Sequence, residues 1–150
     1  MDDKPVLICY DDSDAARRAI DVAATILGPR QAVVLDVGPY VTPAESIALA
    51  SSVVPGAAFE EVNEADARQR ARAGADRARE AGFAADATAE LGAPTWEAIV
   101  DTADEIDASV IVVGSRGLNG AQELFDGSVS HQLARHSGRP LLIVPPEGRR

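Results

Sequence analysis

The stretch SVIVVGSRGLNGAQELFDGS, residues 109–128, joins a short apolar run directly to a glycine-rich segment. The run is near-continuously apolar and rich in β-branched residues, which is typical of a parallel strand buried on both faces. Glycine then suits a backbone that takes a positive φ or comes close to a bulky group. A solvent-exposed loop with turn glycines is the simpler alternative at this point.

Four other apolar runs divide the chain in the same way. They are PVLICY (5–10), QAVVLDV (31–37), FAADATAEL (83–91) and PLLIVP (140–145). Helical patterns lie between the runs, at about residues 12–27, 60–81, 94–106 and 128–136. Because strand and helix alternate, we expect a single doubly wound α/β domain with a parallel sheet and helices on both faces.

The helical segments carry apolar faces and end signals. A Ser/Asp cap precedes the first, Gly28-Pro29 ends it, and its predicted buried face is Ala15, Ala19, Val22, Ala23, Ile26 and Leu27. The second is rich in Ala, Arg and Glu, as expected of a solvated surface helix. The third is predicted to bury Trp96, Ile99, Val100, Ala103 and Ile106, and the fourth Val129 and Leu133. Residues 38–59 are predicted to be a long loop or flap, and 147–150 a frayed tail.

Charge and composition exclude several classes of protein. The 150 residues include 14 Lys and Arg against 24 Asp and Glu, a net charge of -10 that repels nucleic acid and anionic lipid. The single cysteine, Cys9, lies in an apolar run and is expected to fill the core. No run approaches the length that spans a bilayer, and no leader pattern opens the chain, so we expect a cytoplasmic location.

The carboxyl ends of the predicted strands carry the residues suited to a ligand. In open α/β sheets the ligand binds where the strand order reverses, beyond those ends. Asp11, at the end of the first strand, could accept a hydrogen bond from a ribose hydroxyl. After the fourth strand, Gly127-Ser128 opens a helix whose N-terminus suits an anion, although Ser128 could serve only as its cap. Lys4 is the only lysine, which excludes a Walker-type phosphate loop.

Other chemistry finds less support. His131 and His136 are five residues apart, off the spacing that places two metal ligands on one helical face, and no nucleophile elbow of the Gly-x-Ser-x-Gly type is present. We therefore expect neither catalytic residues nor a metal site.

The chain resembles the universal stress protein family, specifically its nucleotide-binding branch. The family's phosphate motif is Gly, two residues, Gly, nine residues, then Gly with Ser or Thr, and it is matched by Gly114, Gly117, Gly127 and Ser128. DDS (11–13) and GAPTWEAIVDTADEIDASVIVVGSRG (92–117) also match. The resemblance implies the same five-stranded parallel sheet, with the strand order 3-2-1-4-5.

The resemblance also implies a bound ATP or another adenine nucleotide, either alone or with Mg²⁺. Asp11 and Val37 would meet the nucleoside. The full nucleotide-binding set would be Asp11, Ser13, Val37, Val113, Gly114, Arg116, Gly117, Gly127, Ser128, Val129 and Ser130. Two residues depart from the family pattern: Asp12 replaces a common glycine, and Asp126 stands where an apolar residue is usual, beside the expected phosphates. A homodimer through the last strand is implied, with Leu141, Leu142, Ile143 and Val144 at its interface, and a regulatory protein partner of unknown identity.

Three alternatives stay open. One is a phosphorylation-controlled receiver domain, with Asp36 as the phospho-acceptor. The second is an ATP hydrolase, for which Asp126 is the available general base and only slow turnover is expected. The third keeps the family's scaffold without a nucleotide. We expect a nucleotide-dependent stress-response protein that binds a partner rather than a fast enzyme.

Overall fold

The computed structural model describes residues 3–36, 56–90, 95–115 and 129–147, and for 56–64 the helical backbone alone. Five strands and four helices are described in these ranges. In chain order they are β1 (Val6–Tyr10), α1 (Asp14–Leu27), β2 (Gln31–Asp36), α3 (Gly56–Ala81), β3 (Ala84–Ala89), α4 (Thr95–Glu105), β4 (Val110–Gly114), α5 (Val129–His136) and β5 (Leu141–Val144).

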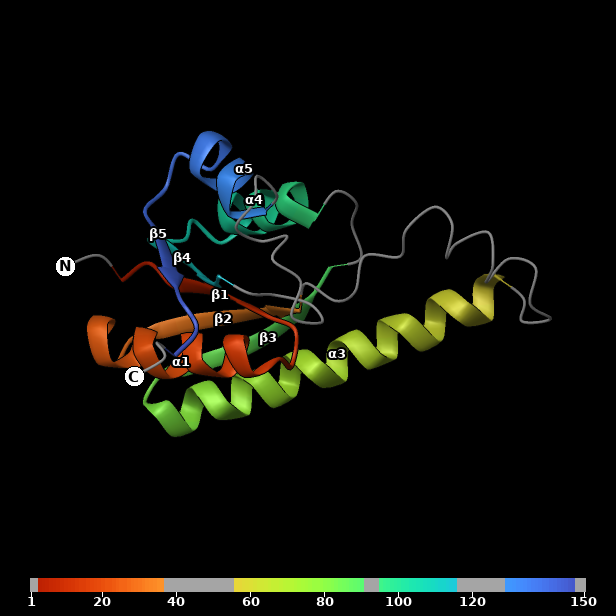
Figure 1. Cartoon of the computed structure of the whole chain (residues 1–150). Coiled ribbons are helices and arrows are strands. Elements are labelled where there is room, and N and C mark those ends of the chain that lie inside the picture. The colour runs from red at the N-terminus through yellow and green to blue at the C-terminus, as the bar shows by residue number, and fades with distance from the viewer. Residues whose placement is uncertain (1–2, 37–55, 91–94, 116–128, 148–150) are drawn as a thin grey trace.

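The strands form one parallel sheet in the order β3-β2-β1-β4-β5. Helices α1 and α3 lie on one face of the sheet, and α4 and α5 lie on the other (Figure 1). The doubly wound fold and the strand order predicted from the sequence are therefore confirmed.

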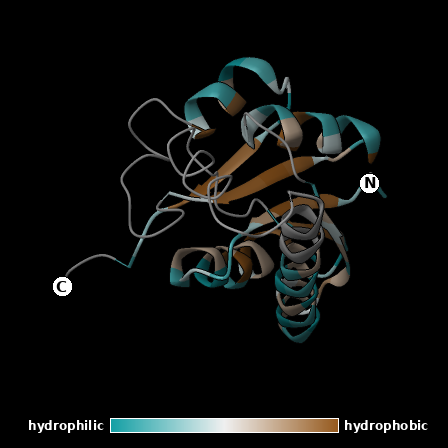
Figure 2. Cartoon of the chain, turned by 90° about the vertical axis from the view of Figure 1, so that its right-hand side faces the viewer, coloured by the Kyte–Doolittle hydropathy of each residue, from teal (hydrophilic) through white to brown (hydrophobic). Residues whose placement is uncertain are grey.

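The two central strands are apolar because both of their faces are covered. Every residue of β1 and β4 is buried, and the apolar strands run between the helical layers (Figure 2). Alternate residues point to opposite faces, so Ile8 packs toward α1 while Leu7 packs toward α4 and α5. Cys9 lies in the second group, and burial raises the pKa of its thiol to about 12. Its expected place in the core is confirmed.

Helix α1 begins and ends where the sequence predicts. Ser13 caps it, with Oγ accepting from the Ala16 N–H at 3.1 Å, and Gly28 ends it at φ +71°. The predicted apolar face was partly wrong. Ala19 and Ala23 are buried as expected, but Ile26 is 61% exposed. The fully buried face is Ala16, Ala19, Ile20 and Ala23.

Helix α3 begins at Gly56, so residues 56–59 belong to the helix and not to the predicted long loop. Its contact with the sheet is a stripe of small residues at helical spacing, Ala67, Ala71, Ala75 and Ala78. The remaining helices agree with expectation: α4 buries Ile99 and Ala103, and α5 buries Leu133. Trp96 and Val129 pack against the same core while staying partly exposed.

Candidate functional site

Strands β1 and β4 are neighbours at the point where the strand order reverses. The two strands are parallel neighbours, with Ile8 opposite Val112. The helix after β1 covers one face of the sheet, whereas α5, the next described element after β4, covers the other. This divergence is the arrangement that opens a ligand crevice in α/β sheets.

Asp11 is held at these strand ends by the start of α1. Its Oδ1 accepts from the backbone N–H of Ser13 at 3.0 Å, and the carboxylate is half-buried. The Ser13 hydroxyl serves the helix as its cap, and it keeps a proton to donate elsewhere. The two residues are therefore brought together as the sequence predicted, with the side chain of Asp11 fixed by the local turn.

Asp12 has a left-handed backbone, with φ +64°. This conformation favours glycine, which is the usual family residue there, and aspartate tolerates it better than most residues do. The Asp12 carboxylate accepts from the Tyr10 hydroxyl at 2.9 Å and from Arg17 at 2.7 Å. These hydrogen bonds hold the pKa of Asp12 below its usual value. The substitution is thus accommodated by specific partners.

Position 114 favours glycine because the first turn of α1 occupies the space that a side chain would need. A Cβ at this position would lie 3.0 Å from the backbone oxygen of Ala15, in the first turn of α1. The glycine lets the end of β4 and the start of α1 approach each other at the crevice. The preceding side chain, Val113, is 2% exposed and points into the core, so only its backbone could reach a ligand.

Helix α5 is the next described element after β4. The first N–H groups of a helix lack intrahelical partners and favour an anion. Ser130, in the first turn, is 5% exposed, while Val129 packs partly against the core. At the far end of the helix His136 stacks on Trp96, with ring centroids 4.9 Å apart. Within the described ranges, no group of three His, Cys, Asp or Glu could hold a metal ion.

Five of the predicted site residues lie outside the described residues. They are Val37, Arg116, Gly117, Gly127 and Ser128, and Asp126 lies outside them as well. Their roles stay as predictions from the sequence.

An ion pair with a buried carboxylate at the end of β2 was not predicted. Asp36 is 1% exposed, and its Oδ1 and Oδ2 accept from Nε and Nη2 of Arg70 on α3 at 3.2 and 3.0 Å. This contact raises the pKa of Arg70. A phospho-acceptor needs an accessible oxygen, so the geometry disfavours the receiver alternative. No sequence signal joins two residues that are 34 positions apart.

Gly74 was also overlooked, although it left a signal in the sequence. A glycine inside a helix rich in Ala, Arg and Glu costs helix stability and calls for a reason. A Cβ at Gly74 would lie 2.7 Å from the ring of Tyr10 and 2.9 Å from the Val34 side chain. The glycine therefore allows α3 to lie directly on β1 and β2.

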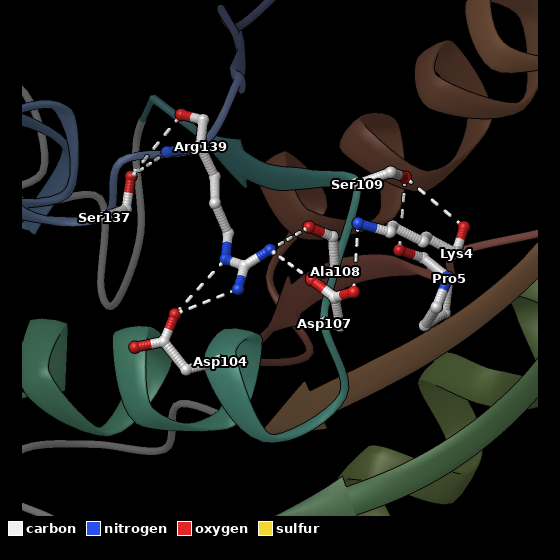
Figure 3. A network of polar contacts seen from close by, with 8 residues as sticks. All are labelled: Lys4, Pro5, Asp104, Asp107, Ala108, Ser109, Ser137 and Arg139. Carbon is white, nitrogen blue, oxygen red and sulfur yellow. Dashed lines mark hydrogen bonds and ion pairs between the residues drawn. The ribbon is translucent and has the colours of Figure 1, made fainter. Parts of the chain in front are cut away.

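A second polar network lies at the opposite end of the sheet (Figure 3). Arg139 joins Asp104 at 3.0 Å and Asp107 at 3.2 Å, and it donates to the backbone oxygen of Ala108. Asp107 also pairs with Lys4 at 3.0 Å. These groups connect the turns that precede β1, β4 and β5, away from the crevice.

The family follows from comparison with known proteins. The model of the universal stress protein family matches residues 4–145. The chain belongs to this family. It is 32% identical over 144 residues to universal stress protein YxiE of Bacillus subtilis, covering 93% of this chain and 97% of the relative. It is 31% identical over 149 residues to universal stress protein Rv1636 of Mycobacterium tuberculosis, covering 94% and 95% of the two chains.

Solved structures share the fold of this universal stress protein. The hypothetical protein PH0823 superposes with a TM-score of 0.73 at 22% identity, covering 99% of this chain and 100% of its own. A universal stress protein crystallised in complex with cAMP superposes with a TM-score of 0.60 at 28% identity, covering 95% and 96%. Among the described residues, no helix is long and apolar enough to cross a membrane.

Proposed function

We propose that this universal stress protein binds an adenine nucleotide between the carboxyl ends of β1 and β4, and acts as a cytoplasmic regulatory protein in a stress response. One observation carries the proposal: β1 and β4 are adjacent parallel strands, and the helices that follow them, α1 and α5, cover opposite faces of the sheet. Asp11 would accept a hydrogen bond from the ribose. The N-terminus of α5 would face the phosphates, with the glycine motif of residues 114–128 between them.

ATP is the nucleotide that we favour. A structural relative solved with cAMP supports an adenine nucleotide in general. The glycine motif and the start of α5 offer several backbone and hydroxyl donors, which suits a chain of phosphates better than a single one. Mg²⁺ would enter with the phosphates, because the described residues contain no three-ligand group of their own.

Hydrolysis is expected to be slow at most. Fast turnover needs a general base within reach of the attacking water. Asp126 is the candidate from the sequence, so multiple turnovers per minute that disappear in Asp126→Asn would establish an enzyme in place of a nucleotide-dependent binding protein.

Mass spectrometry of small molecules released from the purified protein tests the proposal most simply. Titration with ATP, AMP and cAMP, each with and without Mg²⁺, should then follow. A ligand at a hundred times its Kd stabilises the folded state by about 2.7 kcal/mol, so thermal unfolding gives an independent readout. We expect an adenine nucleotide to bind, with ATP the tightest. If no adenine nucleotide binds, the site assignment is wrong.

The edges of the sheet support a homodimer through β5. At the other edge, Ala84 donates its N–H to the Arg30 oxygen, so the groups of Ala85 point away from β2. The Ala85 oxygen accepts from Arg79 Nε at 2.9 Å, which covers part of that free edge. On β5, Ile143 is 37% exposed. We therefore propose pairing through Leu141, Leu142, Ile143 and Val144, with a regulatory protein as a further partner.

Ile143→Lys tests the dimer. The buried charge would oppose association, so sedimentation should show a monomer at concentrations where the wild type is a dimer. Ala87→Lys, an exposed position on β3, is the matched control and should stay dimeric. A monomeric wild type, or an unaffected Ile143→Lys, would contradict this interface.

A further inference from the structure

The ion pair between the buried Asp36 and the partly exposed Arg70 ends the strand next to β1, and no proposed nucleotide contact uses it. Removing a carboxylate from water costs free energy that its attraction to a cation often fails to return, and apolar residues of similar volume often hold a core as well or better. Asp36 is 1% exposed and follows four apolar residues of β2, residues 32–35, whereas the Arg70 side chain is 28% exposed. Stability alone therefore gives a poor account of a charged pair at this place.

The pair is joined to the nucleoside end of the crevice through Tyr10. Tyr10 lies opposite Asp36 in the register of β1 and β2. Gly74, one turn after Arg70, brings α3 onto the Tyr10 ring. The Tyr10 hydroxyl donates to Asp12 at 2.9 Å, directly next to Asp11. Packing and hydrogen bonds thus connect α3 continuously with the loop that carries Asp11.

Electrostatic coupling follows the same route. The pKa of Arg70 is raised first by its hydrogen bonds to Asp36, and the negative charges of Asp12 and Asp66 add to this effect. Hydrogen bonds from Tyr10 and Arg17 lower the pKa of Asp12, and the charge of Arg70 adds to this effect. The guanidinium of Arg70 therefore acts on both strand ends, holding one carboxylate directly and attracting the other.

We propose that Asp36 and Arg70 are positioning residues for the nucleoside half of the site. Their contact holds the carboxyl ends of β1 and β2 against α3, and so fixes Asp11 in the orientation that meets the ribose. Neither side chain needs to touch the nucleotide. This inference rests on the proposed adenine nucleotide site. It adds that the ion pair preorganises the nucleoside end of that site.

The double variant Asp36→Leu with Arg70→Met separates positioning from stability. The apolar pair should fold cooperatively, with a free energy of unfolding equal to or above that of the wild type. Adenosine and ATP should both bind about tenfold more weakly, because preorganisation at the nucleoside end is lost. Tripolyphosphate, which lacks the nucleoside, should bind as it does to the wild type. All three affinities are measurable by titration calorimetry.

Two further variants make the result decisive. Asp21→Leu with Arg77→Met removes an exposed pair that joins the same helix to α1 at 2.7 Å, and it should leave all three affinities unchanged. Arg70→Lys keeps the charge but loses the two-point contact, so it should weaken adenosine and ATP selectively even if the double variant does not fold.

The outcomes distinguish the two proposals. A wild type that binds neither adenosine nor ATP overturns the nucleotide site and the positioning role together. A wild type that binds both, with the folded double variant or Arg70→Lys binding adenosine equally well, overturns the positioning role alone. An equal loss of affinity for tripolyphosphate would also overturn the positioning role, since the effect would then not be confined to the nucleoside end.

Discussion

At the amino ends of β1, β4 and β5, charged side chains bind one another and the turns, whereas at the carboxyl ends of β1 and β2 they join the strand ends to two helices. Arg139, 19% exposed, connects α4 with the turn before β4. At the other end, Asp36 with Arg70 and Asp12 with Arg17 fix strand ends to α3 and α1. Pairs of arginine and aspartate thus hold turns together at the amino end, and hold the strand ends of the proposed site in place at the carboxyl end.

The largest expected effect comes from Gly74→Ala at the carboxyl end. The new Cβ would lie 2.7 Å from the Tyr10 ring, so α3 or the sheet must shift. We expect the free energy of unfolding to fall by about 1–3 kcal/mol in chemical denaturation, although alanine favours the helix. The control is Ala73→Gly on the exposed face, which should cost only the helix propensity. A Gly74→Ala protein more stable than the wild type would contradict the close contact.

Asp11→Asn should affect binding and leave the fold intact. Asparagine can still accept from the Ser13 N–H, but it lacks the charge that strengthens a hydrogen bond to ribose. We expect adenine nucleotides to bind about tenfold more weakly, measured by calorimetry. Asp14→Asn is the matched control, because that side chain is fully exposed and pairs with Arg17 alone in the described contacts. Equal affinities in the two variants would remove Asp11 from the site.

Arg139→Met tests the amino end of the sheet. In contrast to Asp11→Asn, it should lower stability and leave nucleotide binding unchanged. The substitution keeps an apolar stem but loses the contacts to Asp104, Asp107 and the Ala108 oxygen. The free energy of unfolding should fall by about 1 kcal/mol, discounted for partial exposure. Nucleotide affinity should not change. A weakened affinity in a folded variant would show that the two ends are coupled.

The smallest effect is the pH dependence of Asp107. Hydrogen bonds from Lys4 and Arg139 lower its pKa below the ordinary 3.8 in the folded state. The unfolded state therefore takes up the proton first, so the stabilisation is present above pH 3.8 and is lost as the pH falls through the folded value. Asp107→Asn, which suits the left-handed backbone at φ +50°, should lower Tm slightly at neutral pH only. The same Tm difference in strong acid would contradict this origin.

The sequence predicted the parts of the molecule that depend on local pattern. Continuous apolar runs such as residues 109–113 indicated buried parallel strands, and a charged residue after a strand pointed to Asp11. The buried face of α1 was harder to predict, because Ala16 and Ile20 lie next to the predicted Ala15 and Ala19, and apolar residues on two adjoining stripes leave the helical phase open. The pair of Asp36 and Arg70 could not be predicted, since only the folded sheet brings α3 over β2.

Amide hydrogen exchange with and without ATP tests the central claim most directly, because it locates the ligand along the chain. We predict slower exchange on ATP binding at the ends of β1 and β4 and at the start of α5, residues 10–13, 114–115 and 129–131. Residues 104–109 and 137–139, at the amino end, should exchange at unchanged rates. Protection confined to the amino end, or no protection at saturating ATP, would contradict a nucleotide site at the carboxyl ends of the strands.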